Sequence, residues 1–126
     1  MYSVKELSLI FLIGGLTYGL LEIIYRGYTH WTMLLTGGLC FLIFYIINFK
    51  LKTNSIVLRC IIATLIITTL EFLVGYIVNI ILKLNVWDYS NRKLNLMGQI
   101  CLLYSSIWFS LGIPMTALSN FLKSKF

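Results

Sequence analysis

The sequence predicts an all-α polytopic membrane protein with four transmembrane helices, and three observations support this. Hydrophobic residues make up 60% of the 126 residues and charged residues only 11%, with a mean hydropathy of +0.92. Soluble domains carry about 25% charged residues, and a short chain cannot bury so much apolar surface away from water. Four apolar segments each reach the roughly 20 residues that a hydrocarbon core requires. We therefore expect the lipid bilayer to surround most of the chain.

The four predicted spans form one domain over residues 1–126. They cover residues 7–25, 31–49, 55–82 and 98–122. These runs are too long for barrel strands, which alternate in polarity over about ten residues. The first run also exceeds the length of a signal-peptide core, and no small-residue cleavage pattern follows it. We expect it to remain as a helix.

Basic residues flank the apolar runs, and their distribution predicts the topology. With the N-terminus inside, the inner side holds six Lys and Arg residues and the outer side holds four. The inner ones are Lys5, Lys50, Lys52, Arg59, Lys123 and Lys125, and the outer ones are Arg26, Lys83, Arg92 and Lys93. We expect a multi-pass protein of the cell membrane with both termini in the cytoplasm. The net charge of +6 is spread over these flanks, which argues against a nucleic-acid partner.

The two halves of the sequence resemble each other, which indicates an internal duplication. "LLEIIYRG" resembles "TLEFLVGY", with Glu22 over Glu71. "HWTMLLTGGLCFL" resembles "VWDYSNRKLNLMGQICLL", with Trp31 over Trp87. Because each half has two helices, the halves would be related by a pseudo-two-fold axis along the membrane normal. That symmetry predicts similar depths for Glu22 and Glu71, which would face each other if both point inward.

Glu71 is the most unusual residue for a lipid environment. It has eleven uncharged positions on each side. A charged residue near the centre of a bilayer costs about 2.5–3.5 kcal/mol on insertion scales, and such residues usually face a partner or a cavity. Two readings follow: a neutral carboxyl that is hydrogen-bonded between helices, or a carboxylate that responds to a proton or a cation.

A second group of polar residues lies at the end of the first predicted span. Glu22 and Arg26 are separated by four positions, so they share one helix face in the favourable order. Gly27 could end this helix, which would place His30 in the turn. A single interfacial His is more often a hydrogen-bonding loop residue than a reactive one, although it could respond to pH.

The segment "KLNVWDYSNRKLNLMG" is read either as an interfacial loop or as a cap over the bundle, since it combines turn-forming and aromatic residues. From these features we predict one set of residues that line a solute or ion site. They are Glu22, Arg26, His30, Glu71, Trp87, Asp88 and Arg92.

Other motifs point to packing. Gly15 and Gly19 form a Gly-x-x-x-Gly face, Gly37–Gly38 offers a second small surface, and Pro114 is expected to kink the fourth helix. The three cysteines lie in apolar runs without metal-ligand spacing. Since phosphate loops, nucleophile elbows and metal-ligand clusters are also missing from the sequence, we expect no enzyme activity, no cofactor and no metal.

Two segments carry a resemblance to a known family. "EIIYRGYTHWTMLLTGGLCF" and "WDYSNRKLNLMGQICL" resemble the ABC-transporter permease family, also called ABC-transporter type IV or CmpB-like. Its members are small bacterial proteins with several membrane helices. The resemblance implies solute transport and leaves the solute unknown. If it holds, the ATPase must be another chain.

These features lead to one favoured function and two alternatives. We expect a permease-like transport component, present as a homo-oligomer or with a partner membrane or ATPase subunit, because four helices enclose little volume. The first alternative is a membrane scaffold or regulatory subunit that transports nothing. The second is a holin-like pore former, which rests on small size and the basic "KSKF" ending.

Overall fold

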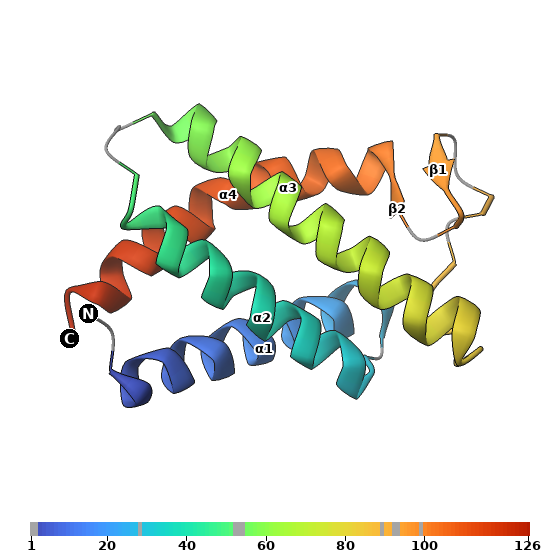
Figure 1. Cartoon of the computed structure of the whole chain (residues 1–126), viewed down its shortest axis with the longest axis horizontal. Helices are drawn as coiled ribbons and strands as arrows, with labels where there is room; N and C mark the ends of the chain where they lie inside the picture. The colour runs from blue at the N-terminus through green and yellow to red at the C-terminus, as the bar shows by residue number, and fades with distance from the viewer. Residues whose placement is uncertain (1–2, 28, 52–54, 89, 92–93, 99) are drawn as a thin grey trace. The chain divides into compact units, whose positions relative to one another are not determined.

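The computed structural model describes residues 3–27, 29–51, 55–88, 90–91, 94–98 and 100–126. Within these residues four α-helices dominate, which confirms the helical fold class (Figure 1). The elements are α1 (Val4–Arg26), α2 (Trp31–Asn48), α3 (Ile56–Gly75), the π-helix η1 (Tyr76–Ile81), strands β1 (Asn95–Leu96) and β2 (Ile100–Cys101), and α4 (Leu102–Lys123).

Three helical stretches are long and apolar enough to cross a membrane. They are Val4–Ile24, Trp31–Asn48 and Ile56–Ile81. The chain is therefore a membrane protein. Helix α4 is not among these stretches in the described part of the chain, so its crossing remains a prediction.

The helix ends follow local capping signals. Ser3 caps α1, because its hydroxyl oxygen accepts a hydrogen bond of 3.0 Å from the Glu6 N–H. Gly27 ends α1 with a φ of 84°, and its N–H donates to the Ile23 carbonyl at 2.8 Å. A left-handed residue at this position suits glycine, which has no Cβ to clash. The expectation that Gly27 ends this helix is confirmed.

The third predicted span differs in its last turn. Residues 76–81 form a π-helix rather than continuing the α-helix, and the Leu82 N–H donates to the Ile77 carbonyl at 2.9 Å. The wider turn is followed by Lys83, whose φ of 57° is left-handed and ends the helix. The uniform helix predicted over residues 55–82 is therefore corrected to two helical types.

Helix α4 begins later than the predicted start of the fourth span at about Gly98. Residues 95–96 instead pair with residues 100–101 as an antiparallel ladder, and α4 begins at Leu102. Both Met97 and Gly98 have positive φ values, of 54° and 73°, which turn the chain back on itself. The apolar character of this segment therefore does not make it helical.

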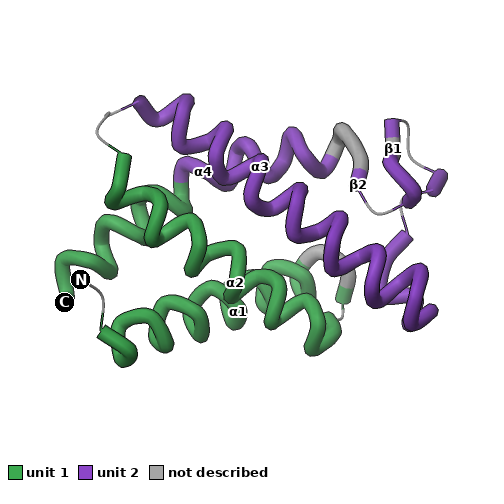
Figure 2. Tube along the Cα trace, viewed as in Figure 1, with its two compact units in different colours: residues 1–54, 114–126 green, residues 55–113 purple. Residues whose placement is uncertain are grey.

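The chain divides into two compact units (Figure 2). Unit 1 comprises residues 1–54 and 114–126, so it holds α1, α2 and the last part of α4. Unit 2 comprises residues 55–113 and holds α3, η1, the β1–β2 pair and the first part of α4. Helix α4 runs unbroken through Pro114, where the division falls, and the kink expected there stays a prediction.

In unit 1, α1 and α2 form a tightly packed antiparallel hairpin. A Cβ on Gly15 would lie 2.7 Å from the Leu34 carbonyl oxygen, and one on Gly38 would lie 2.7 Å from the Phe11 carbonyl oxygen. Real Cβ atoms do not approach backbone this closely, so both positions need glycine. This confirms the predicted role of the small residues, which let membrane helices approach each other closely.

The core of unit 1 lies beside these glycines. Ile10, Phe41 and Tyr45 are buried at its centre. The partly buried apolar residues packed against them come from all three helical segments of the unit: Ile13, Leu42, Phe49, Met115, Leu118 and Leu122. The last turns of α4 are therefore held by the α1–α2 hairpin.

Unit 2 packs α3 against the first part of α4. A Cβ on Gly112 would lie 2.6 Å from the Cys60 Cα, so the two backbones meet closely. One polar contact supports the packing, with the Thr68 and Ser105 hydroxyl oxygens 3.3 Å apart. The structure therefore joins α3 and α4 through a small-residue contact and a hydroxyl pair.

Substituting Gly15 or Gly38 with alanine should destabilise the protein by about 1–3 kcal/mol, the typical cost of overpacking. The added methyl group would push against backbone carbonyl oxygens, which cannot rotate away. Thermal unfolding in detergent measures the effect. Leu16→Ala is the control, because Leu16 is 66% exposed on α1 beside Gly15. If the glycine variants unfold at the same temperature as this control, the close approach of the helices is wrong.

Candidate functional site

Glu71 lies on the buried face of α3, with only 3% of its surface exposed. The other buried residues of this helix recur every three or four positions, as one helix face requires. They are Cys60, Ala63, Ile67 and Gly75. Glu71 is therefore directed into the protein and away from the surface that lipid would cover. Thr68, one turn earlier, adds the hydroxyl contact with Ser105 on the α4 side of unit 2.

Glu22 and Arg26 are placed near the end of α1, in unit 1. The Glu22 side chain is partly buried. The backbone of Arg26 forms the last turn of the helix, and its side chain lies outside the described residues. The predicted pairing of these two side chains therefore remains a prediction.

His30 acts as the N-terminal cap of α2. Its Nδ1 atom accepts a hydrogen bond of 3.3 Å from the Thr32 N–H and lies 2.7 Å from the Thr32 hydroxyl oxygen. The neighbouring Trp31 is 62% exposed, with its ring centre 5.6 Å from that of His30. This geometry supports the reading of His30 as a hydrogen-bonding turn residue.

The long connection between η1 and α4 is organised by Asn79. Its side-chain oxygen accepts hydrogen bonds from the N–H groups of Val86 at 2.7 Å and of Trp87 at 3.3 Å. Both residues are buried, with 5% and 6% of their surfaces exposed. Trp87 therefore packs into the protein and anchors the connection. Asn79 was not among the predicted site residues, although an amide in the last turns of an apolar span is itself an unusual feature.

Asp88 is exposed and forms a local turn with Ser90. Its Oδ1 atom accepts a hydrogen bond of 2.8 Å from the Ser90 N–H. A Cβ on Gly98 would lie 2.8 Å from the same oxygen, so the carboxylate sits close to the β1–β2 turn. Arg92, the remaining predicted site residue, lies outside the described residues. Among the described residues, no group of three or more His, Cys, Asp and Glu side chains could hold a metal ion.

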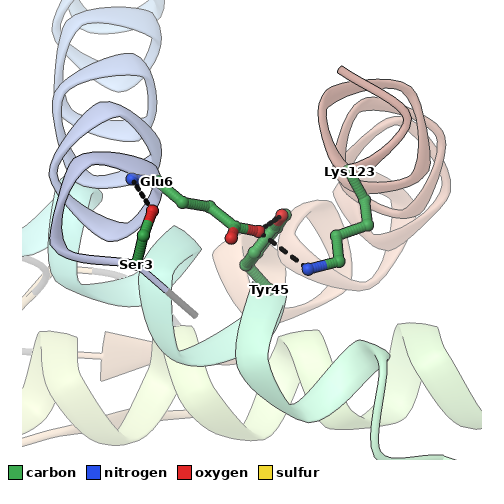
Figure 3. A network of polar contacts seen from close by, with 4 residues as sticks. All are labelled: Ser3, Glu6, Tyr45 and Lys123. Carbon is green, nitrogen blue, oxygen red and sulfur yellow. Dashed lines mark hydrogen bonds and ion pairs between the residues drawn. The ribbon is translucent and has the colours of Figure 1, made fainter. Parts of the chain in front are cut away.

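A polar network outside the predicted site joins the three helical segments of unit 1 (Figure 3). The Oε2 atom of Glu6, on α1, accepts a hydrogen bond from the Tyr45 hydroxyl of α2. The same oxygen forms an ion pair of 3.0 Å with the Lys123 Nζ atom of α4. Glu6 is 3% exposed and Tyr45 is fully buried. The network therefore stabilises a buried carboxylate and fastens α4 to the hairpin.

A second polar contact lies at the same end of unit 1. The Asn48 side-chain amide donates to the Asn120 side-chain oxygen at 3.1 Å. Asn120 is one turn before Lys123, so both contacts hold the same turns of α4. The available sequence signal was the Ser-x-x-Glu pattern of Ser3 and Glu6, a helix-start motif. That motif predicts the cap, but it does not predict the distant partners of the carboxylate.

The three long apolar helical stretches define a polytopic helical membrane protein. The family model described as "Putative ABC-transporter type IV" matches residues 9–126. The chain belongs to this family, which confirms the resemblance. Neither the comparison with curated proteins nor the comparison with solved structures gave a match.

Tyr45→Phe should lower the stability of the protein by about 1 kcal/mol, because it removes a hydrogen bond to a buried carboxylate. Glu6→Gln and Lys123→Gln each remove one partner of the ion pair, so their effects should not add in the double variant. Thermal unfolding in detergent gives these differences. Lys125→Gln, two positions further on, is the matched control. Additive effects of Glu6→Gln and Lys123→Gln would show that the two residues do not interact.

Asn79→Ala should release the N–H groups of Val86 and Trp87 while leaving the helices folded. Loss of one such hydrogen bond lowers the free energy of local opening by about 1 kcal/mol. Amide exchange through this opening should then be roughly five-fold faster. Hydrogen exchange followed by mass spectrometry on residues 84–88 measures this. Ser110→Ala, on the exposed side of α4, serves as the control. Unchanged exchange in residues 84–88 would contradict the anchoring role.

Proposed function

We propose that the chain is the membrane component of a solute transporter, in the cell membrane, with all four α-helices crossing the bilayer and both termini in the cytoplasm. The family match supports transport, and the three apolar helical stretches support the membrane location. The duplication of two helical hairpins, suggested by the sequence, belongs to the same proposal.

Glu71 is the group that we propose to interact with the transported solute or with a coupling proton. The observation that carries this proposal is the burial of Glu71 within the helical stretch Ile56–Ile81, which is otherwise strongly apolar. Retaining an acid at such a position is costly, and acids at membrane depth commonly mark ion or proton pathways. A carboxylate there favours a cation or a proton over an anion.

The remaining predicted residues have supporting roles in this proposal. Glu22 and Arg26 would form a second polar group on α1, while Trp87 and Asp88 belong to the connection that Asn79 anchors. Arg92 would add a positive charge to this connection. His30 caps α2, so we propose an organising role for it.

Energy and a complete path would come from partners. The family description implies ATP-driven transport, so we propose that an ATPase chain associates with this one. A second copy or another membrane subunit would enlarge the bundle, since four helices surround little space. We propose no enzyme activity for this chain itself.

A second candidate function is a scaffold or regulatory subunit of such an assembly. The observation that favours it is the network of Glu6, Tyr45 and Lys123, which joins three helical segments without exposing its carboxylate. If Glu71 plays a similar structural role, its removal would affect helix packing and no solute movement would depend on it.

Glu71→Gln separates the two functions, because glutamine keeps the size and hydrogen-bonding ability of the side chain but cannot bind a proton or a cation in the same way. In cells that lack the chain, wild type and variants are supplied in turn. The ion and metabolite contents of the cells are then measured by mass spectrometry. If the chain transports a solute, restoring the wild type should change the cellular content of that solute. The Glu71→Gln variant should leave this content at the level of the deletion strain.

The control is Leu73→Met, because Leu73 is 52% exposed on the same helix, and it should restore the solute fully. Unfolding of each purified variant in detergent checks that it folds. Full restoration by a folded Glu71→Gln variant would contradict the role of this carboxylate. If the wild type itself changes no solute, while Glu71→Gln lowers the unfolding temperature, the scaffold function is favoured.

A further inference from the structure

We propose that one end of unit 1 is a binding surface for the anionic headgroups of membrane phospholipids. The surface, called the basic end below, consists of the exposed residues Lys5, Lys50, Lys125, Phe121 and Phe126. This proposal depends on the membrane location of the chain and not on its transport of a solute.

Tertiary contacts bring these residues together from distant parts of the sequence. The ion pair between Glu6 and Lys123 places the start of α1 beside the end of α4, as Figure 1 also shows. The ring of Phe49 lies 5.0 Å from that of Tyr45, and the Lys123 Nζ atom is 6.0 Å from the Phe49 ring centre. The end of α2 therefore joins the same end of the unit.

The three exposed lysines adjoin the residues that make these contacts. Lys5 precedes Glu6, Lys50 follows Phe49, and Lys125 lies two positions after Lys123. Sequence adjacency to residues already in contact gathers the three charges at one end of unit 1. The distribution of charges along the sequence predicts on which side of the membrane these lysines lie. It does not predict that the three lysines lie at the same end of unit 1.

The basic end has an excess of positive charge that the protein does not neutralise. The Glu6 carboxylate is engaged with Lys123 and is buried. Within the part of the chain that the structure describes, Lys5, Lys50 and Lys125 have no ion pair. The other acid of unit 1, Glu22, is about 24 Å farther along α1 at 1.5 Å per residue. The excess positive charge of the basic end therefore suits an anionic partner from outside the unit.

The position of the lysines favours lipid over a protein partner. Lys5 lies at the first turn of the apolar stretch Val4–Ile24, and Lys50 lies two residues after the stretch Trp31–Asn48 ends. Residues that directly flank a span meet the lipid headgroups. The Lys125 Nζ atom lies 5.1 Å from the ring centre of Phe121, which is 58% exposed. Exposed apolar rings beside lysines suit the boundary between acyl chains and headgroups, where both can be satisfied.

The experiment compares lipid binding by the purified full chain in a neutral detergent. Phosphatidylglycerol and phosphatidylcholine are titrated separately, and bound lipid is counted by native mass spectrometry. The wild type should prefer phosphatidylglycerol, and added salt should weaken this preference. Each lysine near an anionic surface contributes about five-fold in affinity, so Lys5→Gln, Lys50→Gln and Lys125→Gln combined should reduce the preference by roughly a hundred-fold.

Two variants make the result specific. Replacing the same three lysines with arginine keeps the charges and should keep the preference. Lys83→Gln removes an exposed lysine of unit 2 and should also keep it. Unfolding in detergent verifies that all variants fold. The proposal is overturned if the triple glutamine variant binds phosphatidylglycerol as well as the wild type does. It is equally overturned if the purified wild type shows no preference, in which case the basic end would suit an acidic protein partner instead.

Discussion

Close approach of α1 and α2 is the constraint on which unit 1 depends. Gly15 and Gly38 have no Cβ, so each helix can lie against a backbone carbonyl oxygen of the other. Lipid offers little hydrophobic driving force for helix association, and close van der Waals contact takes its place. The hairpin formed in this way carries Ile10, Phe41 and Tyr45 into one core, against which the last turns of α4 pack.

This packing also explains where buried polar groups are tolerated. A polar side chain removed from water needs a partner, because apolar surroundings offer none. Glu6 meets the requirement through Tyr45 and Lys123, and Asn48 meets it through Asn120. These contacts use groups from different helices, so they also specify how the helices associate. In unit 2, Glu71 lies on the buried face of α3 together with small and apolar residues.

Much of the helical framework could be predicted from local sequence. Long apolar runs predicted α1, α2 and the combined α3–η1 segment to within a few residues, and Gly27 marked the end of α1. The errors fall where local signals compete. The π-helical turn has its own backbone hydrogen bonds, and the β1–β2 pair is a backbone ladder. The apolar character of these segments does not reveal either of them.

By itself, the sequence determined that the chain belongs in a membrane, which segments form its apolar helices, and that Glu71 is unusual there. Composition and local order control these properties, because lipid exposure and helix capping act over one or a few turns. Only the tertiary structure decided that Glu6 joins Tyr45 and Lys123, which brings the start of α1 and the end of α4 together. Such contacts depend on how closely whole helices approach each other. The pattern of apolar and polar residues along the chain does not encode that distance directly.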